Sequence, residues 1–181
     1  MMLLSLGVAQ WWDAHLFKRV AADARAQMGD RGKGLVALIL LVSIVLMVIG
    51  YRAADGAVFW GRSPMLTGIN NLIMIAALYM TSPGPSKGAI FYKMRHPMLT
   101  GFALWAGAHL LVNGDVPSFV LFGGLGFWAL VEMAVINRAE PDWTPPEKGA
   151  IKKDAIFLVA SVVLFGVIGM IHSWLGYVPW G

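Results

Sequence analysis

The residues from Gly34 to Gly50 form an uninterrupted apolar run, GLVALILLVSIVLMVIG, without a charged side chain. As an α-helix this run is about 25 Å long, close to the ~30 Å hydrocarbon core of a bilayer. Over the 181 residues, 58% are hydrophobic and 13% are charged, whereas soluble domains have roughly 45–50% and about 25%. The sequence therefore excludes an ordinary soluble domain and indicates a membrane protein.

Similar apolar segments recur along the chain and predict an all-α, polytopic helix bundle. We expect a single transmembrane domain over residues 1–181 with six transmembrane helices. Pro97 suits the first turn of the fourth span, Gly114 its C-cap, and Asp154 the N-cap of the sixth. The first span has an alternative interpretation as a short interfacial helix that does not cross. The predicted spans are Leu3–Arg19, Gly34–Gly50, Pro64–Met80, the segment between Pro97 and Gly114, Pro117–Asn137 and Ala155–Trp174.

The distribution of lysine and arginine predicts the orientation of this bundle. Twelve of these residues fall in the loops after spans one, three and five, and only Arg52 and Arg62 fall on the other side. Because short cytoplasmic loops carry the excess of positive charge, both termini are expected on the non-cytoplasmic side. The basic residues match anionic lipid rather than nucleic acid, so no nucleic-acid binding is predicted.

This topology places the four histidines at different depths. His96 follows Arg95 at the cytoplasmic edge, and His172 lies at the outer interface. His15 is ~18 Å from the outer side and His109 ~18 Å from the inner side, which puts each about 3 Å from the midplane. His15 and His109 are therefore expected to be the pair that can face one another across a buried cofactor.

His109 is an ionisable residue inside a predicted span, which makes it a candidate for function. Helical spacing places it on one face with aromatic, small and polar side chains that suit a flat ligand. The alternative is a neutral histidine that only bonds a neighbouring helix. The neighbours on this face are Phe102, Trp105, Ala106, Val112 and Asn113.

The run Arg95-His96-Pro97, followed by Ala108-His109-Leu110 and Asn113-Gly114-Asp115, resembles the NnrU family of bacterial inner-membrane proteins. His15 with its basic neighbours and the closing segment His172–Leu175 are also similar to that family. The resemblance covers most of the chain. It implies a multi-pass protein of the bacterial inner membrane, associated with nitrogen-oxide (denitrification) metabolism.

NnrU proteins are related to zeta-carotene isomerase, a haem b membrane protein with histidine ligands that isomerises a cis double bond. The resemblance implies noncovalent haem b with His109 and His15 as the metal ligands, and it extends the cofactor-binding set to His96, Arg95, Trp105 and Asn113. Arg95 and His96 are expected to contact haem propionates or lipid phosphate. The chain has no cysteine, which excludes covalent haem and thiolate ligands; Ala106 replaces the isomerase's cysteine.

Three other interpretations compete with haem binding. RHPMLTG also resembles an element of isoprenylcysteine-type membrane methyltransferases, although Leu99 replaces its tyrosine. The chain is alternatively a structural or assembly subunit that contacts other membrane subunits and has no chemistry of its own. A carboxylate pair or proton path formed by Asp13 and Glu132 is the third interpretation, but we expect Glu132 to be solvated at the cytoplasmic interface.

Overall fold

The computed structural model describes residues 1–180, and most of them are helical, as the apolar runs predict. Two short strands and the connecting loops make up the rest of this range. The elements in chain order are α1 (Met2–Val20), α2 (Ala22–Gln27), α3 (Gly29–Arg52), β1 (Val58–Trp60), α4 (Pro64–Thr81), α5 (Gly84–Lys87), α6 (Pro97–Val112), β2 (Gly114–Asp115), α7 (Val116–Ser118), η1 (Phe119–Gly123), α8 (Gly124–Ala139) and α9 (Ile151–Trp174).

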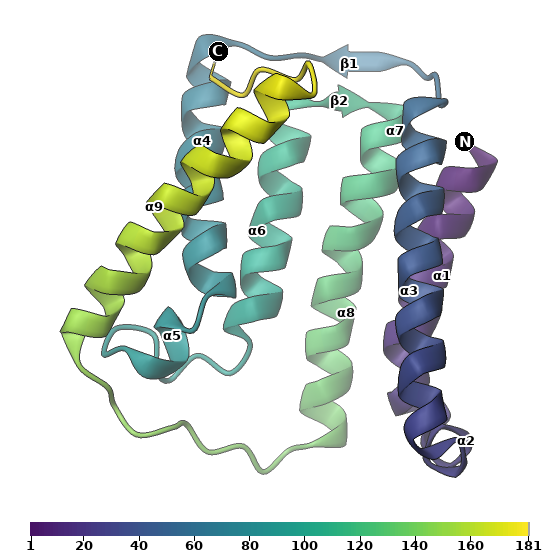
Figure 1. The fold of residues 1–181 in the computed structure, drawn as a ribbon, viewed down its shortest axis with the longest axis vertical. Coiled ribbons are helices and arrows are strands. Elements are labelled where there is room, and N and C mark those ends of the chain that lie inside the picture. Colours follow the sequence, from purple (N-terminus) through teal and green to yellow (C-terminus); the bar gives the residue numbers. More distant parts are fainter. Residues whose placement is uncertain (181) are drawn as a thin grey trace.

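Helices α1 and α3 form a hairpin connected by α2 (Figure 1). Glycines allow their backbones to approach closely. A Cβ atom at Gly7 would lie 2.8 Å from Cγ of Met47, and one at Gly50 would overlap the backbone of Leu4. Leu4 is fully buried in this contact. Small residues at such contacts are the usual means by which membrane helices pack.

Helices α4 and α6 form a second hairpin (Figure 1). Gly101 of α6 lies against α4, where a Cβ atom would come within 2.6 Å of the carbonyl oxygen of Ala77. Helix α9 packs on the outside of this pair, against α4 and α5. Helix α8 contacts both α6 and α1 and so joins the two hairpins. The interior formed by α1, α6 and α8 is the part of the fold that carries the candidate site.

Strands β1 and β2 pair antiparallel at one end of the bundle, with Val58 opposite Asp115. The indole N–H of Trp60 donates to the carbonyl oxygen of Leu110 over 3.1 Å, and the ring covers Gly114, where a side chain would overlap it. Both termini lie at this end, whereas α2, α5 and the segment 140–150 lie at the opposite end (Figure 1).

The prediction that Asp154 caps the last helix is wrong. Helix α9 begins one turn earlier, at Ile151. Asp154 is buried and accepts hydrogen bonds from the Tyr79 hydroxyl (2.5 Å) and the Ala89 N–H (2.6 Å). The carboxylate is therefore satisfied by neighbouring segments instead of by its own helix, and it fixes α9 against α4.

Four helical segments of the described chain are long and apolar enough to cross a membrane. They correspond to the second, third, fifth and sixth predicted spans. Helix α6 is apolar but has only 16 residues, and α1 is not among the four. The membrane character of the chain follows from these helices. They are Gly29–Arg52, Pro64–Thr81, Val116–Ala139 and Ile151–Trp174.

Candidate functional site

His109 lies near the end of α6 with one ring nitrogen already bonded. Its Nδ1 atom is 2.9 Å from the carbonyl oxygen of Trp105, one turn earlier. Because a carbonyl oxygen only accepts, Nδ1 carries the proton of the neutral ring, and the lone pair is on Nε2. Metal-ligating histidines usually hold their second nitrogen in this way.

His15 on α1 has the same local geometry. Its Nδ1 atom donates to the carbonyl oxygen of Trp11 over 2.9 Å, which again leaves the lone pair on Nε2. The two segments also share a sequence pattern, Trp-x-x-Ala-His, at residues 11–15 and 105–109. Ala14 and Ala108 are both buried. Two helices thus present an imidazole in the same tautomer, each beside the tryptophan one turn before it.

Each imidazole is flanked by two aromatic rings. The His15 ring lies 4.3 Å from Trp11 and 4.5 Å from Trp128 of α8, measured between ring centroids. The His109 ring lies 4.9 Å from Trp105 and 4.5 Å from Phe122 of η1. One flanking ring comes from the same helix, and the other comes from the segment η1–α8.

Phe102 connects the surroundings of the two histidines. Its ring centroid is 6.0 Å from Trp11, 5.1 Å from Trp105 and 5.3 Å from Trp128. The result is one continuous aromatic cluster. His15 and His109 do not contact one another in it, because aromatic side chains lie between them. We define the aromatic cluster as Trp11, His15, Phe102, Trp105, His109, Phe122 and Trp128.

Of the other predicted site residues, only Trp105 belongs to the aromatic cluster. Asn113 donates to the carbonyl oxygen of His109 over 2.8 Å and has no bond to the His109 ring. His172 repeats the Nδ1 bond, to the carbonyl oxygen of Ile168 (2.9 Å), on an exposed part of α9.

Arg95 and His96 lie outside the cluster, just before the first turn of α6. The His96 Nε2–H donates to the Asn137 side-chain oxygen over 2.8 Å. The Arg95 guanidinium donates to the backbone carbonyl of Glu140. The carboxylate of Glu140 also pairs with Arg19 at 2.5 Å, and this bond holds the pKa of Glu140 below its usual range. The basic end of the bundle thus has two guanidinium groups on one residue.

Sequence reasoning missed Trp128 and Phe122, which come from the fifth span. A signal was present in the repeated Trp-x-x-Ala-His pattern, but nothing local identifies the partner rings. The expectation that Glu132 is solvated is wrong, since its exposed fraction is 8%. Glu132 lies on the buried face of α8 with Trp128, one turn before it.

Clusters of metal-ligating side chains are absent from the described part of the chain. No group of three or more His, Cys, Asp or Glu side chains converges anywhere in residues 1–180. A metal held only by several protein ligands therefore finds no site in this range. A haem can be held by one or two imidazole ligands in an apolar surround. The free Nε2 atoms and the apolar rings of the aromatic cluster fit this donor chemistry.

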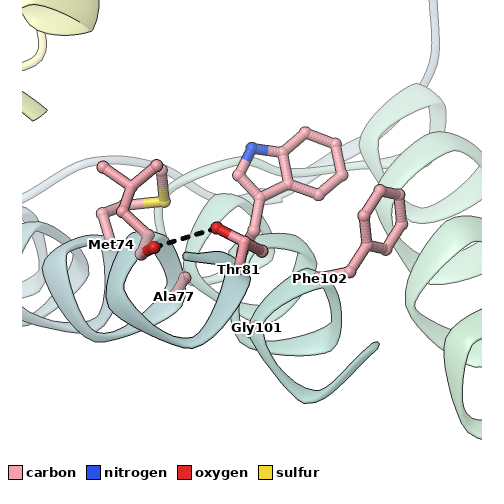
Figure 2. A pocket seen from close by; sticks show the side chains of 7 residues that line it. Met74, Ala77, Thr81, Gly101 and Phe102 are labelled. Atoms are coloured by element: carbon pink, nitrogen blue, oxygen red, sulfur yellow. Dashed lines mark hydrogen bonds between the residues drawn. The ribbon is translucent and has the colours of Figure 1, made fainter. Parts of the chain in front are cut away.

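Two apolar cavities, both of them open to the outside of the bundle, adjoin α6. The first, of about 230 Å³, lies between α4 and α6, and Figure 2 shows Met74, Ala77 and Thr81 along one side of it, opposite Gly101 and Phe102. It shares Phe102 and Trp105 with the aromatic cluster. The second, of about 570 Å³, is lined by Trp60, Leu66, Gly107, Leu110, Leu111 and Phe119. Neither His15 nor His109 lines either cavity.

Comparison with known proteins gave one result. A family model described as NnrU protein matches residues 3–180, which is nearly the whole chain. No curated protein and no solved structure matches the chain.

Proposed function

Because the chain belongs to the NnrU family, we propose that it is a membrane protein that binds noncovalent haem b within its helix bundle. His109 is the principal ligand, and His15 is the second. The observation that carries this proposal is the shared geometry of the two imidazoles. Each has Nδ1 bonded to a backbone carbonyl and the Nε2 lone pair free inside an aromatic cluster.

A haem shared by both histidines requires the aromatic cluster to open. The two imidazoles are separated by the rings of Phe102, Trp105, Trp11 and Trp128. A flat haem ring would replace the packing contacts that these side chains now make with one another. Such an exchange replaces one apolar contact by another, so little apolar surface is exposed to water or lipid. The cavity beside Phe102 and Trp105 provides room into which these rings can rotate.

The haem, when bound, supplies an iron that can carry an electron, bind a small gas or polarise a polyene double bond. These chemistries correspond to the two roles under consideration, in nitrogen-oxide metabolism and in carotenoid isomerisation. The contribution of the chain itself is to hold the imidazoles and to exclude water. It has no cysteine, so no thiol lies beside His109. Ala106 occupies the position one turn before that histidine and is 1% exposed.

The same proposal includes six membrane-spanning helices in a bacterial inner membrane, with both termini outside the cytoplasm. Its support is that the segments with the basic residues lie at one end of the bundle and the termini lie at the other (Figure 1). Arg95 and His96 would then lie at the cytoplasmic edge, where a guanidinium binds haem propionate or lipid phosphate.

Absorption spectra of the protein purified in detergent, oxidised and then reduced, test this proposal. We expect a haem spectrum with one iron per chain and extraction of the haem by acidic organic solvent, as befits a noncovalent cofactor. Two irons per chain would show that the histidines serve separate sites. A protein that is folded and free of haem would favour the structural or assembly subunit instead.

A further inference from the structure

Three buried polar side-chain atoms lack a hydrogen-bond partner within residues 1–180. They are Nε1 of Trp11, Nε1 of Trp128 and Oε2 of Glu132. Trp11 lies on α1, and Trp128 and Glu132 lie on α8, two helices that pack against one another. The Trp11 and Trp128 rings meet edge to face at 5.5 Å, and Glu132 follows Trp128 by one turn on the buried face of α8.

Such a concentration of unpaired groups indicates a missing partner. Buried polar groups in proteins are nearly always hydrogen-bonded, and in lipid an unpaired group is especially costly. Two other indoles have such a partner: Trp12 donates to the Gly124 carbonyl and Trp60 to the Leu110 carbonyl, each over 3.1 Å. The neighbouring indoles of Trp11 and Trp128 have no such partner.

The three atoms are complementary to water. Two indole N–H groups can only donate, and a carboxylate oxygen can only accept. A water molecule does both, and buried waters typically make about three bonds to groups of this kind. The exposed fractions of Trp128 and Glu132, 4% and 8%, place them inside the bundle and not on its rim.

The charges around Glu132 connect it to the basic end of the bundle. From α1, Arg19 acts on Glu132 through its charge, and Arg19 is itself paired with Glu140 at the surface. The imidazole of His15 lies one turn before Arg19 and touches Trp128. From the start of α6 come Arg95 and His96, and η1 has no titratable side chain.

We propose that the contact between α1 and α8 holds bound water, and that Glu132 exchanges protons between this water and the basic end of the bundle. The step is a simple proton relay. Oε2 of Glu132 takes a proton from a hydronium ion on the Arg19 side, which is left as neutral water, and gives it to water beside the indoles, which becomes hydronium until the reverse step returns the proton. One O–H bond breaks and one forms in each transfer, with no change of oxidation state. This inference concerns the packing of Trp11 and Trp128 in the haem-free chain and is tested without haem.

Hydrogen exchange of the indole N–H groups tests the hydration. The full-length protein, with ¹⁵N-labelled tryptophan, is placed in lipid nanodiscs and transferred to D₂O. The indole signals are assigned from Trp11→Phe, Trp12→Phe and Trp128→Phe. We expect the N–H groups of Trp11 and Trp128 to exchange at least tenfold faster than that of Trp12, which is bonded to a carbonyl. Equal protection of all three would overturn the hydrated contact.

Infrared spectroscopy tests the relay. The chain has only three glutamates, and Glu140 and Glu147 are exposed, so ¹³C-glutamate labelling isolates few bands. We expect the Glu132 band to interconvert reversibly between its acid and carboxylate forms on pH steps, and to disappear in Glu132→Gln but not in Glu147→Gln. Trp128→Phe, which keeps the carboxyl group, should shift this band. A Glu132 band that ignores both pH and Trp128→Phe would refute the relay.

Discussion

The imidazole of His109 lies on the ring of Phe122, with centroids 4.5 Å apart and planes inclined by 25°. Phe122 belongs to η1, a π-helical turn between α7 and α8. Such turns are rare and often occur at functional sites. The irregular turn therefore supplies the ring that covers the histidine for which we propose the main ligand role.

Substitution of the two histidines should separate their roles. His109→Ala is expected to abolish most haem binding, because it removes the principal ligand. His15→Ala should retain haem but convert a low-spin spectrum into a high-spin one. His172→Ala is the matched control, since it removes an imidazole with the same backbone bond and should change neither absorption nor EPR spectra. A native spectrum in His109→Ala would contradict the ligand assignment.

Phe102→Ala tests whether the aromatic cluster must open for haem. Phe102 touches three tryptophans, so its loss should destabilise the haem-free protein, by up to about 3 kcal/mol for a half-buried ring. Because the cluster then opens at lower cost, added haem should bind faster than to the wild type. Stopped-flow absorption measures the rate, and thermal denaturation measures the stability. A slower reconstitution would mean that Phe102 helps to hold the haem.

His96→Ala should leave the iron spectrum essentially intact. His96 is bonded to Asn137 and lies about 20 Å from His109 along α6, at 1.5 Å per residue. The expected effect of His96→Ala is weaker binding of haem propionate or lipid phosphate at the surface. Arg95→Gln should weaken retention of haem more than His96→Ala does, because a guanidinium makes the stronger anion contact. Loss of low-spin character in His96→Ala would refute this placement.

Reporter fusions decide the orientation. A periplasmic reporter fused after Trp180 should be active, and the same reporter placed in the segment 140–150, beside Lys148, should be inactive. The reason is that Lys and Arg residues concentrate at that end of the bundle. An inactive reporter at the C-terminus would contradict the predicted orientation of α9.

Two glycines of α3 should differ sharply in their tolerance of a methyl group. Gly50→Ala would press a Cβ atom into the backbone of Leu4, and overpacking of this kind costs about 1–3 kcal/mol. Gly34→Ala meets no atom within 4 Å, and should be neutral or slightly stabilising because alanine favours helix. Thermal denaturation in detergent compares the two. Equal melting temperatures would contradict the close contact of α1 and α3.

Much of the fold could be predicted from the sequence because its signals are local. Apolar runs predict the four long helices, and Pro97 marks the start of α6 as expected. The positions of His15 and His109 along their helices follow from the helical rise alone. That both histidines ligate one haem stays a prediction. In the structure each imidazole packs against aromatic rings and not against the other imidazole.

Contacts between helices could not be predicted from the sequence and are seen in the folded structure alone. An all-α membrane chain, its basic loops and the tryptophans one turn before His15 and His109 can be recognised from composition and helical periodicity. The placement of Trp128 and Phe122 on the imidazoles, the burial of Glu132 and the bonds of Asp154 to α4 depend on how α8 and α9 rotate and pack. That rotation is set by close packing between residues far apart in the chain, which no local pattern encodes.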